Sequence, residues 1–416
     1  MSAKEEVSKE TPTRADVEAL LAHWDFPFPL REFKLLFGGY SGTSVKVVGG
    51  NGVRHVLKIC HGYEQADVEA QARVAVYARG CGCDEICTFY PLKASTSAFA
   101  FVRADGTPCC LLSWVDGVAA DKVLSAGAVP ASAVLHAVGA GLGRLHSVPP
   151  PAGAGAASIR VVETNGACDV RKHLSDEIAK VFETSAAVRG HPFLPFYAAQ
   201  LENLKAAWTS PGLPRGVLHG DPFLDNIMLD PATGGLEGFV DMEDVCIGPL
   251  LFDIACCASA CCFRADDNAL DMRRMRHLLG GYASERPLSP AERKVFVAFM
   301  KLTMLCNCTW RFKNFNVDHR ELESCRDAHV ELQERIEALE DDMTVGFIEA
   351  ILAELPKVVV PFSSSSAMPP PKAKASKATA PGVMAPASSS RVQLGVALGV
   401  AAAAAAACVW WARRSR

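Results

Sequence analysis

The chain has 416 residues, 50% of them hydrophobic, with 42 basic and 46 acidic side chains. Its length exceeds the roughly 250–300 residues at which a single hydrophobic core stops growing, so two lobes and an appended tail are expected. The net charge of −4, with both signs mixed along the chain, excludes the basic field that drives nucleic-acid binding, and polynucleotide substrates are not expected.

The 16 cysteines include neighbours that one disulfide rarely joins, as at Cys109–Cys110, Cys256–Cys257 and Cys261–Cys262. No secretory signal is apparent, and a reducing cytosol is expected. Cys81, Cys83 and Cys87 resemble half of a zinc site, but no second pair follows at finger-like spacing. Small buried thiols are the simpler interpretation.

The first part of the chain is β-rich. Residues 1–14 are polar without apolar periodicity and are expected to be a disordered leader. The patterns that follow predict helices over 15–23 and 66–78, and strands over 33–37, 44–48, 53–59, 98–102 and 109–114. Residues 15–116 are therefore expected to form a small β-rich N-terminal lobe.

The next part is mainly helical. Helices are predicted over 132–145, 194–208, 250–262, 291–312 and 320–355, around one compact β-loop region over 217–241. Residues 117–355 are expected to form a larger C-terminal lobe. The predicted fold class is α+β with two lobes.

The last residues have a different composition. Residues 356–391 are rich in Pro, Ser and Lys and predict a flexible linker. Residues 392–411 hold no charge, and as a helix they would span ~30 Å, the thickness of a bilayer core. Trp410, Trp411 and the basic residues beyond them favour a C-terminal transmembrane helix, with the catalytic domain anchored on the cytosolic side. Eight of the twenty residues are Ala, so a solvated polyalanine helix is the alternative.

The segment 217–230 carries the strongest chemical signal. Asp221 is followed five positions later by Asn226, with apolar residues on both flanks, which is the spacing of a kinase catalytic loop. Asp221 would position the acceptor hydroxyl and Asn226 would hold Mg²⁺. Asp241 ends the apolar strand that follows and is the expected second metal ligand. An Asx-rich turn would explain either motif alone, but not both in this order.

The nucleotide site is expected in the N-terminal lobe. A glycine-rich turn lies between two strands, where backbone N–H groups can approach the phosphates of ATP through Gly38, Gly39, Ser41 and Gly42. Lys58 lies inside an apolar strand and needs an anionic partner such as the α- and β-phosphates, although a surface-facing lysine is the alternative.

Two further features complete the predicted nucleotide site. Glu69 is the acid expected to orient Lys58, with Glu64 and Asp67 as competitors in sequence. The apolar strand 111–117 ends in a turn, and its backbone groups at Ser113 and Val115 are expected to contact the adenine ring.

In this order, these motifs resemble the aminoglycoside-phosphotransferase superfamily, which has a protein-kinase-like fold. The resemblance covers roughly residues 33–336 and includes Leu142–His146. The segments 248–255 and 310–316 are most similar to homoserine kinases of the bacterial type.

The resemblance implies an ATP-dependent small-molecule kinase. It makes Asp221 the catalytic base, Asn226 and Asp241 the Mg²⁺ ligands, and Lys58 a contact of ATP. It makes Asp253 a structural residue that braces the catalytic loop from the following helix. His219, within the loop, is also expected to be structural.

The acceptor is expected to be a small amino alcohol, with homoserine first. Asp225, Glu243 and Asp244 cluster near the acceptor side and suit an ammonium group, unless these acids and Arg311 pair with one another. Arg311 would bind a substrate carboxylate if it faces the cleft. Met242 replaces the aromatic residue usual in the superfamily, and Glu243 and Asp244 add charge, so other acceptors stay open. These acceptors are choline or ethanolamine, or an aminoglycoside or sugar. A membrane-anchored pseudokinase scaffold is the non-enzymatic alternative. No protein partner is predicted.

Overall fold

The computed structural model describes residues 11–36, 42–151, 174–208 and 210–356. Most of the predicted leader, the glycine-turn residues Gly38, Gly39 and Ser41, the linker beyond residue 356 and the predicted membrane span 392–411 lie outside the described residues. Within the described ranges, no helix is both long enough and apolar enough to cross a bilayer.

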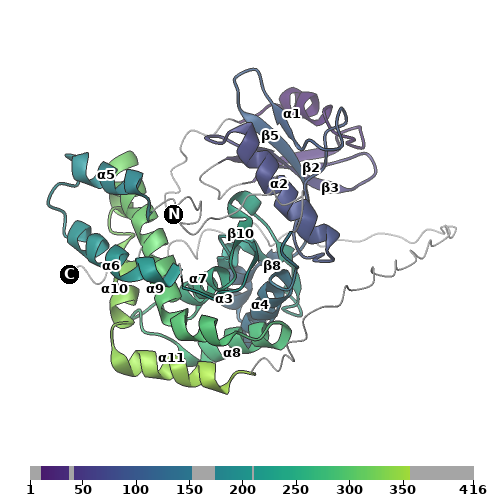
Figure 1. Cartoon of the computed structure of the whole chain (residues 1–416). Helices are drawn as coiled ribbons and strands as arrows, with labels where there is room; N and C mark the ends of the chain where they lie inside the picture. Colours follow the sequence, from purple (N-terminus) through teal and green to yellow (C-terminus); the bar gives the residue numbers. More distant parts are fainter. Residues whose placement is uncertain (1–10, 37–41, 152–173, 209, 357–416) are drawn as a thin grey trace. The chain divides into compact units, whose positions relative to one another are not determined.

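The N-terminal part is built on one antiparallel sheet in the order β1-β2-β3-β5-β4 (Figure 1). Its strands are β1 Glu32–Leu36, β2 Thr43–Val48, β3 Arg54–Ile59, β4 Ala100–Val102 and β5 Pro108–Ser113. The five strands predicted from the sequence pattern are therefore confirmed, with shifts of one or two residues at their ends.

Two helices cover the two faces of this sheet. Helix α1 (Arg14–Leu21) packs Val17 and Leu21 against the side chains that β2 and β3 point to one face, among them Val45 and Leu57. Helix α2 (Gln65–Gly80) packs on the other face, where alternate residues of β5 such as Leu112 lie. The side chains of a strand point alternately to the two faces, so one apolar run in β5 serves both layers.

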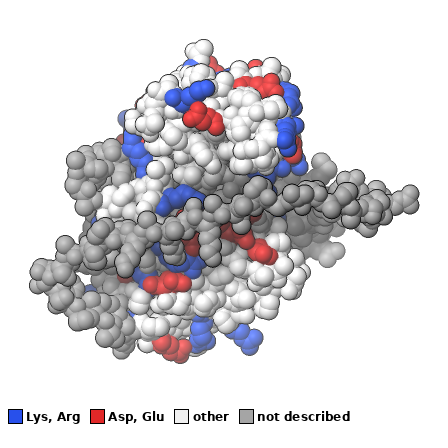
Figure 2. Space-filling view, turned by 90° about the vertical axis from the view of Figure 1, so that its right-hand side faces the viewer, with Lys and Arg blue, Asp and Glu red and all other residues white. Residues whose placement is uncertain are grey.

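The remainder of the described chain is mainly helical (Figure 1). Its helices are α3 Ala120–Ala126, α4 Ala131–Leu145, α5 Asp176–Thr184, α6 Phe193–Trp208, α7 Leu251–Cys261, α8 Met272–Glu285, α9 Pro290–Lys313, α10 Val330–Ala338 and α11 Asp342–Glu354. On the face drawn in Figure 2, acidic and basic side chains are scattered among uncharged ones.

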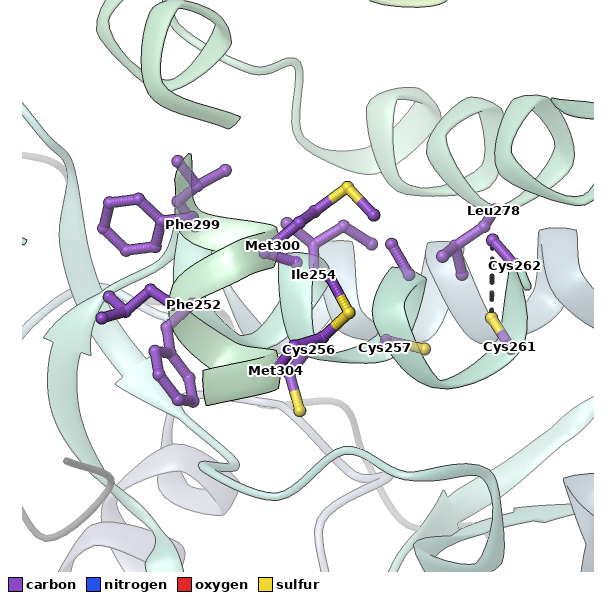
Figure 3. Packing of buried hydrophobic residues seen from close by; sticks show 14 of the residues in the cluster. Phe252, Ile254, Cys256, Cys257, Cys261, Cys262, Leu278, Phe299, Met300 and Met304 are labelled. Carbon is purple, nitrogen blue, oxygen red and sulfur yellow. Dashed lines mark hydrogen bonds between the residues drawn. The ribbon is translucent and has the colours of Figure 1, made fainter. Parts of the chain in front are cut away.

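Helices α7 and α9 form the centre of the larger core, where Phe252 and Cys256 of α7 lie beside Phe299, Met300 and Met304 of α9 (Figure 3). The cysteines of α7 are free thiols buried in this core, as their apolar surroundings in the sequence predicted: Cys256, Cys257 and Cys261.

Two small antiparallel sheets carry the loops between the helices. One pairs β7 (Arg215–Leu218) with β10 (Cys246–Pro249), and the other has the order β6-β8-β9, from Val118–Ala119, Ile227–Leu229 and Leu236–Phe239. The predicted catalytic loop joins the two sheets, because it leaves β7 and enters β8.

The helix predicted over 320–355 is wrong as a single element. The segment contains a short 3₁₀ helix at Glu323–Cys325 and the separate helices α10 and α11. Asp341 ends the run because its side chain accepts the N–H of Thr344 and caps a new helix, which needs non-helical backbone at the cap.

Candidate active site

The catalytic loop holds Asp221 and Asn226 together. The side-chain amide of Asn226 donates to the Asp221 backbone oxygen at 2.9 Å and to its Oδ2 at 3.0 Å. Between them, η3 (Leu224–Asn226) provides the turn that brings the chain back. Gly220, before Asp221, has φ +86°, and a Cβ there would lie 2.3 Å from the Asp244 backbone oxygen, so this position requires glycine.

Asp221 lies among other carboxylates. Burial, and then Asp244, Asp241 and Asp225, raise its pKa well above the usual range, while the hydrogen bond from Asn226 opposes that rise. Negative groups gathered in a poorly solvated site repel one another, and a bound cation would relieve that repulsion.

The donor types fit Mg²⁺, which prefers oxygen ligands and is usually held by one or two carboxylates plus substrate phosphates. Asn226 and Asp241 are the residues that would hold it. Among the described residues, no group of three or more His, Cys, Asp or Glu side chains is arranged to hold a metal by itself. The arrangement suits an ion completed by nucleotide phosphates.

Asp241 connects this loop to the N-terminal lobe. It follows β9 with left-handed backbone, φ 61°, at the start of η4 (Met242–Asp244). Lys58 Nζ of β3 lies 2.8 Å from Asp241 Oδ1 and 2.6 Å from Glu243 Oε1. Burial disfavours the charged form of Lys58, but Asp241 and Glu243 outweigh it and raise the pKa of Lys58 well above its usual value. Lys58 faces the site and not the outer surface.

The structure does not bring Glu69 to Lys58, so the predicted pairing is wrong. Glu69 Oε1 accepts the backbone N–H groups of Phe99 and Ala100 at 2.8 and 2.9 Å, and its other oxygen pairs with Arg73. The carboxylate is used to close the start of β4 against α2. Glu243 takes its place beside Lys58, held from the other side by the Tyr63 hydroxyl, which donates to Oε2 at 3.1 Å.

Asp253 fixes the catalytic loop from α7. Its fully buried carboxylate accepts the backbone N–H groups of His219 and Gly220 at 2.6 and 3.0 Å. The ring of His219 in turn contacts the Val240 backbone oxygen at 2.8 Å and so ties the loop to the residue before Asp241. Both residues act structurally, because they hold the backbone on either side of the site.

Sequence reasoning missed the buried polar chain behind Asp253. His146 lies 3.1 Å from Asp253 and 2.7 Å from the Tyr282 hydroxyl, to which Arg286 donates at 2.8 Å. Arg286 also pairs with the fully buried Glu292 at 2.9 Å. His146 ends the Leu142–His146 motif, and that was the signal available for it. Tyr63 lies shortly after β3, and no sequence pattern marked it as a site residue.

Gly42 and Ser113 are two further residues that the sequence assigned to the nucleotide site. A Cβ at Gly42 would lie 2.8 Å from the Ile59 oxygen and 3.5 Å from Lys58 Cε, so Gly42 lies next to Lys58. The N–H of Ser113 already donates to the Thr88 oxygen at 2.9 Å, and its hydroxyl accepts the N–H of Thr88 at 3.0 Å.

The predicted acceptor residues lie in three places. Asp225 and Asp244 act electrostatically on Asp221, whereas Glu243 lies with Lys58 on the nucleotide side. Arg311 of α9 pairs with Glu331 at 3.0 Å and lines a cavity of about 140 Å³ that also contacts Phe223 of the catalytic loop.

Comparison with known proteins agrees with this geometry. The family model described as "Phosphotransferase enzyme family" (APH) matches residues 32–288. A homoserine kinase of Afipia carboxidovorans is 31% identical over 190 residues, which are 45% of this chain and 51% of that protein. A homoserine kinase of Gluconacetobacter diazotrophicus is 41% identical over 97 residues, 23% of this chain and 29% of that protein. The chain thus spans about half or less of the length of these relatives.

Solved structures with the same fold cover most of the chain. Amicoumacin kinase hAmiN, in complex with AMP-PNP and Ca²⁺, gives a TM-score of 0.60 at 16% identity over 85% of this chain and 96% of its own. A microcompartment-associated aminopropanol kinase gives a TM-score of 0.57 at 15% identity, over 81% of this chain and 99% of its own. A choline/ethanolamine kinase family protein from Mesorhizobium loti gives 0.53 at 17% identity over 81% and 98%.

Proposed function

The chain belongs to the phosphotransferase enzyme family, and from that membership we propose that it transfers the γ-phosphoryl group of ATP to the hydroxyl of a small amino alcohol, with homoserine as the first candidate. The observation that carries the proposal is the meeting of Asp221 and Asn226 with the Lys58–Asp241 pair, because these groups come from distant parts of the chain. Positioning and charge neutralisation supply most of the rate in phosphoryl transfer.

Each residue has one task in the proposed reaction. Asp221 accepts the proton of the acceptor hydroxyl, whose oxygen forms the new bond to the γ-phosphorus while the bond to the bridging oxygen of ADP breaks. Lys58 contacts the phosphates. Mg²⁺ held by Asn226 and Asp241 would neutralise charge on the phosphates.

The choice of a small amino alcohol has two supports. The two sequence relatives described above are homoserine kinases. The cavity beside the catalytic loop, at about 140 Å³, is below the ~300–1,000 Å³ of pockets for drug-sized ligands. A bulky aminoglycoside fits that volume poorly. Choline and ethanolamine stay as rival acceptors, and a nucleotide-binding pseudokinase is the rival outside the enzyme class.

Incubation of the full chain with ATP, Mg²⁺ and a panel of alcohols tests the proposal, with ADP release as the readout. Homoserine should stimulate release, and Asp221→Asn should lower turnover by ~10²–10⁴ while nucleotide affinity is kept. Undiminished turnover in that variant would remove the base role from Asp221. Magnesium-dependent nucleotide binding with no alcohol consumed would favour the pseudokinase.

A further inference from the structure

The cavity that Arg311 lines lies against the catalytic loop. Phe223, two positions after Asp221, forms part of its wall, and α7, α9 and α10 form the rest. Cys256 of α7 is another wall residue, and Figure 3 shows it beside Met304 of α9. Burial, and then the charge of Asp221, raise the pKa of the Cys256 thiol, so this wall is within electrostatic reach of Asp221.

The far wall carries an unequal set of charges. Arg311 and Arg335 both pair with one carboxylate, Glu331, so two guanidinium groups share a single negative charge. Arg335 is buried and is held by the Ser259 and Asn268 oxygens, each at 3.2 Å. Burial lowers the pKa of Arg335, and the charge of Arg311 lowers it further, while Glu331 opposes the shift.

Arg311 is the arginine with donors to spare. Among the described residues, its polar contacts are made through Nη1, to the Ala328 oxygen at 2.9 Å and to Glu331 at 3.0 Å. Its Nε and Nη2 remain for a ligand. A guanidinium group binds a carboxylate best through two parallel N–H groups, which gives direction as well as affinity.

We propose that this cavity holds the acceptor as an α-amino acid, with its carboxylate on Arg311, its ammonium group beside Glu331 and its side-chain hydroxyl directed past Phe223 to Asp221. This rests on the proposed function and names its substrate class. An α-amino acid carries its carboxylate and its ammonium group on one carbon. The cavity wall offers a guanidinium group and a carboxylate, Arg311 and Glu331, 3.0 Å apart. The net positive wall selects against amino alcohols that lack a carboxylate.

A comparison of two acceptors tests the assignment on the full chain. L-Homoserine and 3-aminopropan-1-ol have the same hydroxyl and ammonium groups and differ only by the carboxylate. Arg311→Met should lower kcat/KM for homoserine ~10- to 100-fold, since a hydrogen bond to a charged group contributes about 1.5–3 kcal/mol. It should change the value for 3-aminopropan-1-ol less than about twofold, because that acceptor does not use the guanidinium group.

Arg311→Lys and Arg326→Met serve as matched variants. Arg311→Lys keeps the charge but loses the paired donors, so homoserine should be impaired to an intermediate degree. Arg326 makes its contacts with the Arg320 oxygen and Glu323, away from the cavity, and its replacement should leave both acceptors unaffected. Equal losses for the two acceptors, or no preference of the wild type for homoserine, would overturn the assignment.

Binding without chemistry separates this inference from the proposed function. Calorimetry should detect homoserine binding to the wild type but not to Arg311→Met, with Mg²⁺·ATP binding retained in both as evidence of folding. If homoserine binds through Arg311 but no phosphoryl transfer occurs, the proposed function fails and the site assignment stands. If phosphoryl transfer to homoserine occurs and Arg311→Met is unimpaired, the proposed function stands and the site assignment fails.

Discussion

Lys58 finds its acidic partners in the C-terminal lobe and not on the helix that follows it in sequence. Asp241 and Glu243 both lie within 2.8 Å of its ammonium group, and Tyr63 holds Glu243 from the far side. Sequence position suggested Glu69 because it follows the strand at a suitable distance. Glu69 instead accepts the N–H groups of Phe99 and Ala100. These tertiary contacts cannot be predicted from sequence spacing.

Replacement of the two acids tests which of them serves Lys58. Glu243→Gln should lower kcat/KM for ATP about tenfold, equivalent to ~1.4 kcal/mol, because Lys58 loses a charged partner in a site of reduced polarity. Glu69→Gln should have little effect on kcat/KM, since an amide oxygen can still accept both backbone N–H groups. Steady-state kinetics on the paired variants gives the answer, and greater damage from Glu69→Gln would contradict the arrangement.

His329 is a buried residue with a predictable effect of pH on stability. Burial lowers its pKa below 6.5; His191 and Arg311 lower it further, while the Arg326 carbonyl and Asp327 oppose the shift. The unfolded chain therefore binds a proton more readily than the folded chain below about pH 6.5. This contribution to the free energy of unfolding is complete above that pH and is lost as the pH falls, by up to ~1.4 kcal/mol per unit.

Chemical denaturation at pH 7 and pH 5 measures this contribution. The difference in unfolding free energy between the two pH values should be smaller in His329→Gln than in the wild type. Asp221, whose pKa is raised, acts in the opposite sense, so the difference between variant and wild type is the meaningful quantity. A steeper dependence in the variant would show that His329 does not titrate below its unfolded value.

At the scale of the elements, α4 and α8 approach each other closely through glycine. A Cβ at Gly139 would lie 2.0 Å from the Leu278 oxygen, and one at Gly281 would lie 2.1 Å from the His136 oxygen. His146 is the C-cap of α4 and Tyr282 lies in α8, so the packing of these helices also sets the polar chain behind the catalytic loop. Sequence patterns predicted α4, but α8 was missed.

Adjacent glycines in α8 provide an internal control for this packing. Gly281→Ala should lower the free energy of unfolding by about 1–3 kcal/mol, because an added methyl group in a packed interface displaces backbone. Gly280→Ala meets nothing within 4 Å and should raise it by up to ~1 kcal/mol through helix propensity. Thermal or denaturant unfolding of the two variants should move in opposite directions; a common direction would argue against close packing.

For the whole described chain, the sequence predicted a β-rich part followed by a mainly helical part. The sequence pattern predicted the strands, and the spacing of Asp221 and Asn226 predicted the loop, because both patterns are local in the sequence. The break between α10 and α11, the position of Glu243 and the charged wall around Arg335 were not predicted. Each depends on a cap or on contacts between elements far apart in the chain.

The groups around Asp221 are proposed to transfer a phosphoryl group to an acceptor hydroxyl. The most direct measurement is a phosphorus NMR spectrum of the full chain incubated with ATP, Mg²⁺ and homoserine. A phosphomonoester signal should grow together with ADP and should be absent without Mg²⁺ or with Asp221→Asn. Release of inorganic phosphate alone, or an equal phosphomonoester signal from Asp221→Asn, would contradict it.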